Sequence, residues 1–144
     1  MTARTTLRLL KCEKGMAALE FALLAPALLA LVFGVIIYSI YFTALIGVRQ
    51  AAAEGARAAV AGLSLSERVT LAQDRAQAVI DNYGSLLGGK TQPEITAGAG
   101  DTSGTFRVDV RYDMSGSPIM KYGNFVPLPD SNVEASVTVT NGGY

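Results

Sequence analysis

The 28 residues between Glu20 and Arg49 carry no charged side chain, and this run constrains the fold of the 144-residue chain more than any other feature. As an α-helix, the run is about 42 Å long, whereas the hydrocarbon layer of a bilayer is about 30 Å thick. A small soluble domain could not bury a fully apolar helix of this length. The run therefore predicts a single membrane-spanning helix, for which membrane lipid is the expected surrounding.

Basic residues precede the apolar run. Residues 1–15 contain four basic side chains against one acidic one, whereas residues 16–144 contain eight basic and eleven acidic side chains. A basic segment before a span stays in the cytoplasm. We therefore expect residues 1–15 to be a disordered cytoplasmic leader and the C-terminal part to lie outside the cytoplasm. No basic patch indicates a nucleic-acid partner.

A single long helix is expected from about Met16 to about Ala61, because alanine-rich helical sequence continues beyond the span. Pro26 removes a backbone donor, which predicts a kink or a weakened turn near Ala22. Gly62 is suited to cap the C-terminus of the helix.

Small residues recur every four positions in the second half of this helix, at Gly47, Ala51, Gly55 and Ala59. This spacing places them on one stripe, where another backbone can approach closely. Two interpretations remain open. The stripe either packs against helices of other subunits, or it packs against the next helix of the same chain.

A second helix is predicted from Ser64, which has capping-box spacing to Glu67, to Gly84, which is expected to end it before a turn at residues 88–90. Its apolar stripe consists of Val69, Ala72, Ala76, Val79, Ile80 and Tyr83.

The last third of the chain alternates with period two. Residues 105–113 and 132–141 predict half-buried strands, and a shorter strand is expected at Glu94–Ala97. The long loop of residues 115–131, between the two longer strands, predicts either a crossover or an exposed binding loop. The expected class is α+β: a leader (1–15), a transmembrane and assembly helix (16–62), and an outer domain (63–144) in which a short helix covers a small antiparallel sheet.

Catalytic and metal-binding patterns are scarce. The chain has no histidine, and its single cysteine, Cys12, lies in the leader. Asp109 and Asp113 share a strand face with arginines, which is typical of a solvated surface and not of an acid–base pair. Asp101 and Asp130 do not lie in a loop of repeated calcium ligands. We expect no enzyme activity, no cofactor and no metal.

The start of the apolar run resembles a known family. Lys14-Gly15, then Met16, and then Glu20-Phe21 followed by a long apolar helix is similar to a type IV prepilin. The glutamate, the alanine-rich exit from the span and the small β-rich end resemble the TadE-like minor pilins, or pseudopilins, of the tight-adherence (Flp) pilus. The resemblance implies cleavage between Gly15 and Met16 by a membrane-embedded prepilin peptidase, and assembly contacts through Glu20 and Phe21.

The resemblance also implies partners and a location. The partners would be the prepilin peptidase, other pilins or minor pilins, and the inner-membrane assembly platform. The protein would cross the bacterial inner membrane once, with a periplasmic domain, and could enter an extracellular pilus involved in cell adhesion. The chain is longer than the major pilins of these pili, which favours a minor subunit.

Two alternatives remain at the sequence level. Glu20 either pairs with the Met16 ammonium of a neighbouring subunit, or lies at headgroup depth near a helix N-terminus, where the helix dipole favours it. The chain could also be an uncleaved, single-pass anchored domain that binds a periplasmic partner. A removed signal peptide fits poorly, because the apolar run is far too long, although Ala51 and Ala53 form a small-x-small pair.

Overall fold

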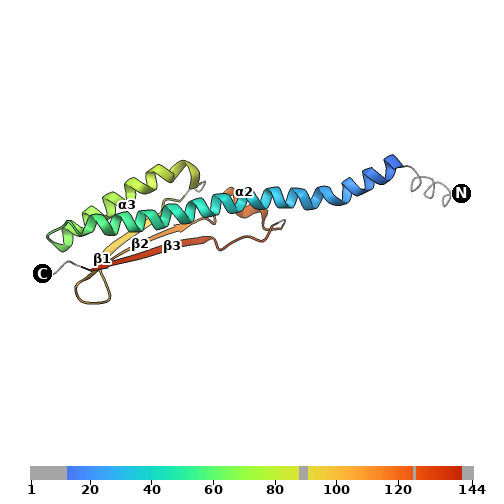
Figure 1. Ribbon diagram of the computed structural model, residues 1–144. Coiled ribbons are helices and arrows are strands. Elements are labelled where there is room, and N and C mark those ends of the chain that lie inside the picture. The colour runs from blue at the N-terminus through green and yellow to red at the C-terminus, as the bar shows by residue number, and fades with distance from the viewer. Residues whose placement is uncertain (1–12, 88–90, 125, 141–144) are drawn as a thin grey trace. The chain divides into compact units, whose positions relative to one another are not determined.

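The computed structural model describes residues 13–87, 91–124 and 126–140, which form two α-helices, a three-stranded sheet and a short 3-10 helix (Figure 1). The chain divides into two compact units, Met1–Ile36 and Ile37–Tyr144. The boundary between the units lies inside the long helix. The predicted α+β class is confirmed.

Helix α2 spans Glu13–Ala59 and is the predicted long helix. It begins three residues before the expected start at Met16, so the last part of the predicted leader is helical and not disordered. The helix continues through Pro26 without a break. Residues 1–12 of the predicted leader, with Cys12, lie outside the described residues.

The end of α2 is closed by tight turns. The Ala61 amide donates to the Ala58 carbonyl at 3.2 Å, and the Gly62 amide donates to the Ala59 carbonyl at 3.1 Å. Gly62 follows the helix as predicted, but its φ is not positive, so it is not a left-handed cap. A Cβ on Gly62 would come within 2.9 Å of the Arg68 amide nitrogen. Glycine is therefore needed at this position for the close approach of the next helix.

Helix α3 spans Leu65–Leu87 and begins with the predicted capping interaction. The Glu67 amide donates to Ser64 Oγ at 3.2 Å, and the Glu67 carboxylate accepts a bond from the Leu63 amide at 2.9 Å. The reciprocal bond thus reaches one residue further upstream than in a standard capping box.

The predicted end of α3 at Gly84 is wrong, because the helix continues to Leu87. Gly84 is exposed, and a Cβ placed on it would meet no atom within 4 Å. An exposed glycine inside a helix costs only about 1 kcal/mol relative to alanine, which packing elsewhere along the helix can offset. The turn predicted at residues 88–90 lies outside the described residues.

The sheet has three antiparallel strands in the order β1 (Glu94–Ala99), β2 (Thr105–Asp113), β3 (Asn132–Thr140). β1 is two residues longer than predicted. The turn between β1 and β2 uses Gly104 at φ 78°, a left-handed conformation that glycine adopts without strain. The predicted alternation in β2 is confirmed, since one face is buried through Phe106, Val108, Val110 and Tyr112.

The connection between β2 and β3 is not a crossover, so that predicted alternative is wrong. It joins strands that are direct antiparallel neighbours. It contains a 3-10 helix at Pro118–Tyr122 and contributes apolar side chains to the core: Met114, Ile119 and Val126. Burial of these side chains explains why so long a connection is ordered, although its sequence has no periodicity.

The core of the second unit lies between the helices and one face of the sheet (Figure 1). A Cβ on Gly55 of α2 would lie 3.4 Å from Val108 of β2, and α3 packs against β1. The opposite face of the sheet is polar. The fold is therefore a two-layer arrangement in which alternation along β2 separates the core from a solvated face.

Candidate functional site

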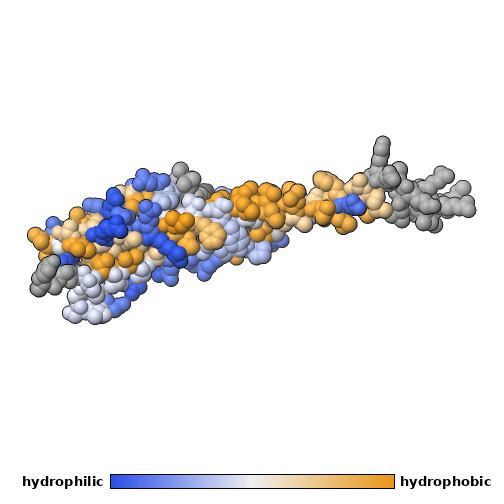
Figure 2. Space-filling view, in the orientation of Figure 1, coloured by the Kyte–Doolittle hydropathy of each residue, from blue (hydrophilic) through white to orange (hydrophobic). Residues whose placement is uncertain are grey.

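The apolar part of α2 is exposed along the first unit. From Gly15 to Ile36 every side chain is exposed or half-buried, although most are large and apolar. Figure 2 shows the same segment as an almost continuous hydrophobic surface. Gly15–Ala59 is long and apolar enough to cross a membrane by length and composition. A helix that is apolar on all sides and not buried in protein fits a single-pass membrane anchor.

The apolar run is longer than the hydrocarbon layer is thick, because its C-terminal part packs in the core of the second unit. From Ile37 onwards one side of α2 lies in the core of the second unit, where Ile37, Ala44 and Val48 are at most 2% exposed. The remaining segment, residues 16–36, is about 32 Å long as a helix, which matches the hydrocarbon thickness.

The four residues predicted for processing and assembly lie together at the start of α2. Gly15 and Met16 belong to its first turn and are exposed, and Phe21 is 71% exposed. Glu20 is exposed and is the only charged residue between Gly15 and Arg49. Among the residues whose side chains the structure describes, none forms an ion pair or hydrogen bond with Glu20.

The small-residue stripe of α2 is buried within the chain itself. Ala51 is 0% exposed and Ala59 is 1% exposed, while Gly47 and Gly55 are also buried. A Cβ on Gly47 would lie 3.1 Å from the ring of Tyr83. Of the two interpretations, packing against the next helix of the same chain is the one that this structure contains.

Gly55 is a point of close approach between α2 and α3. A Cβ on this residue would lie 2.9 Å from the Ala72 carbonyl oxygen and 3.2 Å from the Ala76 Cβ. Hydrogen bonding supports the same contact, because the Tyr83 hydroxyl donates to the Gln50 side chain at 2.7 Å. Other surfaces of α2 must therefore make any contact with another subunit.

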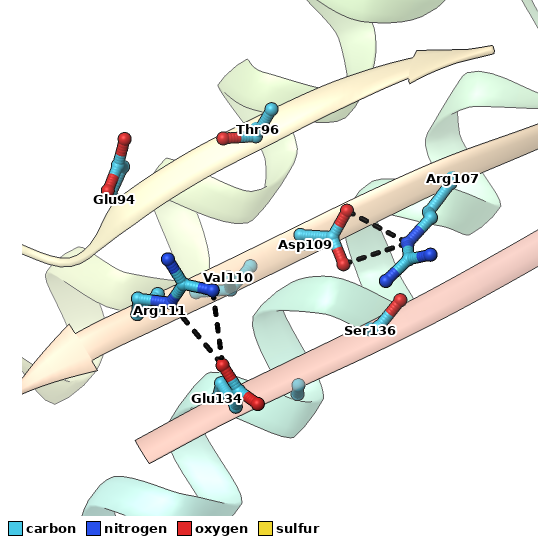
Figure 3. A pocket seen from close by; sticks show the side chains of 9 residues that line it. Glu94, Thr96, Arg107, Asp109, Val110, Arg111, Glu134 and Ser136 are labelled. Carbon is cyan, nitrogen blue, oxygen red and sulfur yellow. Dashed lines mark hydrogen bonds and ion pairs between the residues drawn. The ribbon is translucent and has the colours of Figure 1, made fainter. Parts of the chain in front are cut away.

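The polar face of the sheet forms a shallow concave surface lined by charged residues of all three strands (Figure 3). Arg107 Nε donates to both carboxylate oxygens of Asp109, at 2.9 and 3.0 Å, and Arg111 donates to Glu134 at 3.2 and 3.3 Å. The bond to Asp109 raises the pKa of the Arg107 guanidinium above its ordinary value, with a further contribution from Asp101. Because these groups are exposed, their pairing contributes little to stability.

The two aspartates of β2 do not form a carboxylate pair. Asp109 is engaged by Arg107, whereas Asp113 accepts bonds from the Ser115 amide at 2.8 Å and the Ser115 hydroxyl at 2.9 Å. These bonds lower the pKa of the Asp113 carboxyl. Within the described parts of the chain, no group of three or more metal-ligating side chains occurs.

Sequence reasoning missed a cluster of aromatic residues where α2 enters the second unit. The ring of Phe42 lies 6.2 Å from that of Tyr38 and 5.9 Å from that of Tyr41, measured between centroids. The signal was present in the sequence, because aromatic residues at the end of an apolar span are typical of a membrane interface.

Together, these features define a class of protein: an α+β unit attached to one exposed apolar N-terminal helix that fits a membrane anchor. Residues 15–57 match the family model described as TadE-like protein. The match covers most of α2 and confirms the predicted resemblance, so the chain is similar to TadE-like proteins in this segment. No curated protein and no solved structure matches the chain.

Proposed function

We propose that this chain is the precursor of a minor pilin or pseudopilin that is cleaved after Gly15 and takes part in assembling a tight-adherence pilus. One observation carries the proposal. The family match begins at Gly15, in the first turn of α2, and the exposed apolar part of α2 that follows, residues 16–36, has one charged residue, Glu20, the fifth residue after the cleavage point. Prepilins have this arrangement, as the sequence resemblance implies.

Cleavage requires local opening of the helix, because Gly15 lies within α2 and a peptidase binds its substrate in an extended form. Two features lower the cost of opening. The first turn of a helix lacks part of its hydrogen bonding, and glycine destabilises a helix by about 1 kcal/mol relative to alanine. Gly15 thus supplies both access to the backbone and a turn that unwinds readily.

Cleavage would place a new ammonium group on Met16, one helical turn before Glu20. Residues four apart lie on the same face of a helix, so the ammonium and the carboxylate would be presented to the same neighbour. A carboxylate in an apolar environment is costly unless it is paired. A subunit would therefore be stable in the filament only when its Glu20 meets the ammonium of an adjacent subunit.

The second unit would face the periplasm, and the first would cross the inner membrane with the basic leader in the cytoplasm. Partners would include the prepilin peptidase, other pilins and the assembly platform. The proposed role is structural and not enzymatic, which agrees with the separate partners of Asp109 and Asp113.

An uncleaved anchored binding domain is the second candidate. The observation in its favour is that α2 runs from Glu13 through Gly15 into the apolar segment without interruption. The two candidates differ in whether residues 1–15 persist in the mature protein.

Pilus number tests the proposed function. Cells lacking the chain should carry few or no tight-adherence pili, and the unaltered chain should restore them. The chain with Gly15→Val should not restore them, although it should reach the membrane in normal amount. Restoration by Gly15→Val would contradict the proposal and favour the uncleaved domain.

A further inference from the structure

Strand β3 forms one edge of the sheet, and alternate residues along it point their main-chain groups outward. Just before β3 begins, the Met114 amide donates to the Ser131 carbonyl at 2.8 Å, in a pair that continues the register of β2 and β3. Hydrogen-bonded pairs alternate along an antiparallel ladder. Every second residue of β3 therefore directs its N–H and C=O groups away from β2. These residues are Asn132, Glu134, Ser136, Thr138 and Thr140.

The outward main-chain groups of β3 form a long and regular edge. The Asn132 amide donates to the Asp130 carboxylate at 3.0 Å, and no other bond from a described residue reaches these groups. The nine residues of β3 pair with β2 without a break in register, so the edge has no bulge, and they include neither lysine nor proline. Proteins use these devices to keep other strands away from an exposed edge. The edge of β3 is therefore suited to accept a further strand.

The core side of this edge calls for apolar residues in the added strand. Ala135 and Val137 lie on the core side of β3 and are half-buried, whereas their partners on β2, Val110 and Val108, are fully buried. The apolar layer thus ends at β3 with part of its surface uncovered. Because side chains alternate between the two faces of a sheet, a strand with an apolar residue at every second position would continue this layer.

The polar side of the same edge has an excess of negative charge. Glu134 lies on the edge strand (Figure 3), and its side chain is 68% exposed although Arg111 donates to it. Opposite charges on neighbouring strands attract, and like charges repel. The face as a whole carries four acidic and two basic side chains, which are Glu94, Asp109, Asp113 and Glu134 against Arg107 and Arg111. A basic residue beside Glu134 would therefore favour binding of the added strand.

We propose that the outer edge of β3 binds an extended segment of a different protein, which has apolar residues at alternate positions and a basic residue beside Glu134. The segment would add a fourth strand to the sheet. A second copy of the chain fits less well, because its own edge strands, β1 and β3, each contain one glutamate and no basic residue. The edge lies wholly within the second unit, so the proposal requires neither cleavage at Gly15 nor a membrane.

Amide hydrogen exchange of the full chain in detergent, followed by nuclear magnetic resonance, tests the edge. The probe is a synthetic nine-residue peptide in which threonine and valine alternate and the central threonine is replaced by lysine. Without the peptide, the outward amides of Ser136 and Thr138 should exchange rapidly, and the amides of Val137 and Val139, which bond to β2, should exchange slowly. With free peptide at about nine times its Kd, exchange at the outward amides should slow about tenfold.

Two variants and a second peptide show whether the binding uses the edge and the charge. Ser136→Pro removes one outward N–H and leaves the pairing with β2 intact, and it should weaken peptide binding at least about fivefold. The matched control is Ala97→Pro, which removes an outward N–H from the β1 edge, since the Gly100 amide donates to the Thr105 carbonyl at 2.9 Å and pairs alternate. It should leave binding unchanged. A peptide with glutamate in place of the lysine should bind at least about threefold more weakly.

Three outcomes would overturn the proposal. Unchanged exchange at Ser136 and Thr138 at millimolar peptide would show that the edge does not accept a strand, and this measurement needs no variant to fold. Equal weakening of peptide binding by Ser136→Pro and Ala97→Pro would show that binding is not specific to β3. Slow exchange of the outward amides without peptide, which becomes rapid on dilution of the protein, would show that a second copy of the chain occupies the edge.

Discussion

Replacing Glu20 with alanine should reduce the number of assembled pili by at least about tenfold, while the protein still reaches the membrane and is still shortened. Removing one partner of a buried ion pair costs about 3–5 kcal/mol, because the other charge is left without compensation. The loss would fall on docking, since Glu20 has no partner among the described side chains of its own chain. Pilus counts by electron microscopy, together with the mass of the membrane-bound protein, measure the effect.

Glu20→Gln is the matched control for this effect, because it keeps the shape and the hydrogen-bonding capacity of the side chain and removes only its charge. Glu20→Gln should lower the number of assembled pili almost as much as Glu20→Ala does, whereas Glu20→Asp should retain partial assembly. Normal pilus numbers with Glu20→Gln would contradict the pairing account. They would favour the interpretation in which the carboxylate lies at headgroup depth and interacts with the helix dipole, an effect of only about 0.3–1 kcal/mol.

Replacing Gly55 with valine should destabilise the second unit by about 1–3 kcal/mol, the usual cost of overpacking a core. The added Cβ alone would approach the Ala72 carbonyl oxygen to 2.9 Å, and a backbone atom cannot move aside as a flexible side chain can. For a unit of this size, we expect the melting temperature to fall by roughly 4–20 °C. Thermal unfolding of the full chain in detergent, followed by circular dichroism, measures the change.

Gly84→Val is the control for this substitution. It makes the same change inside a helix, at a position where a new Cβ meets nothing within 4 Å, and the melting temperature should change by only a few degrees. Equal effects of the two substitutions would show that the approach of α2 to α3 at Gly55 is not tight. The intramolecular role of the small-residue stripe would then be wrong.

Regular patterns in the sequence predicted elements of the fold reliably. The alternation through Phe106 and Tyr112 predicted β2 and its buried face, and the spacing of Ser64 and Glu67 predicted the start of α3. Both patterns reflect interactions between residues close in sequence. Gly84 was misleading for the same reason, because a local helix-breaking preference of about 1 kcal/mol is overridden by packing elsewhere along the helix.

Features that depend on distant contacts could not be predicted. The spacing of Gly47 and Gly55 showed that another backbone comes close, but could not show that α3 of the same chain supplies it. The path of the β2–β3 connection depends on the burial of Ile119 and Val126, which have no periodic relation. Residues 15–21 were recognised because their resemblance to the family lies in a short local stretch of sequence, within the residues 15–57 that the family model matches.

The intact mass of the protein isolated from membranes, with and without the prepilin peptidase, is the most direct test of the central claim. We predict a chain that begins at Met16 only when the peptidase is present, and a full-length chain when Gly15 is replaced by valine. A mass that always includes Met1–Gly15 would contradict the account and leave an anchored binding domain. A mass that begins within the second half of α2 would show that the membrane helix is a discarded signal.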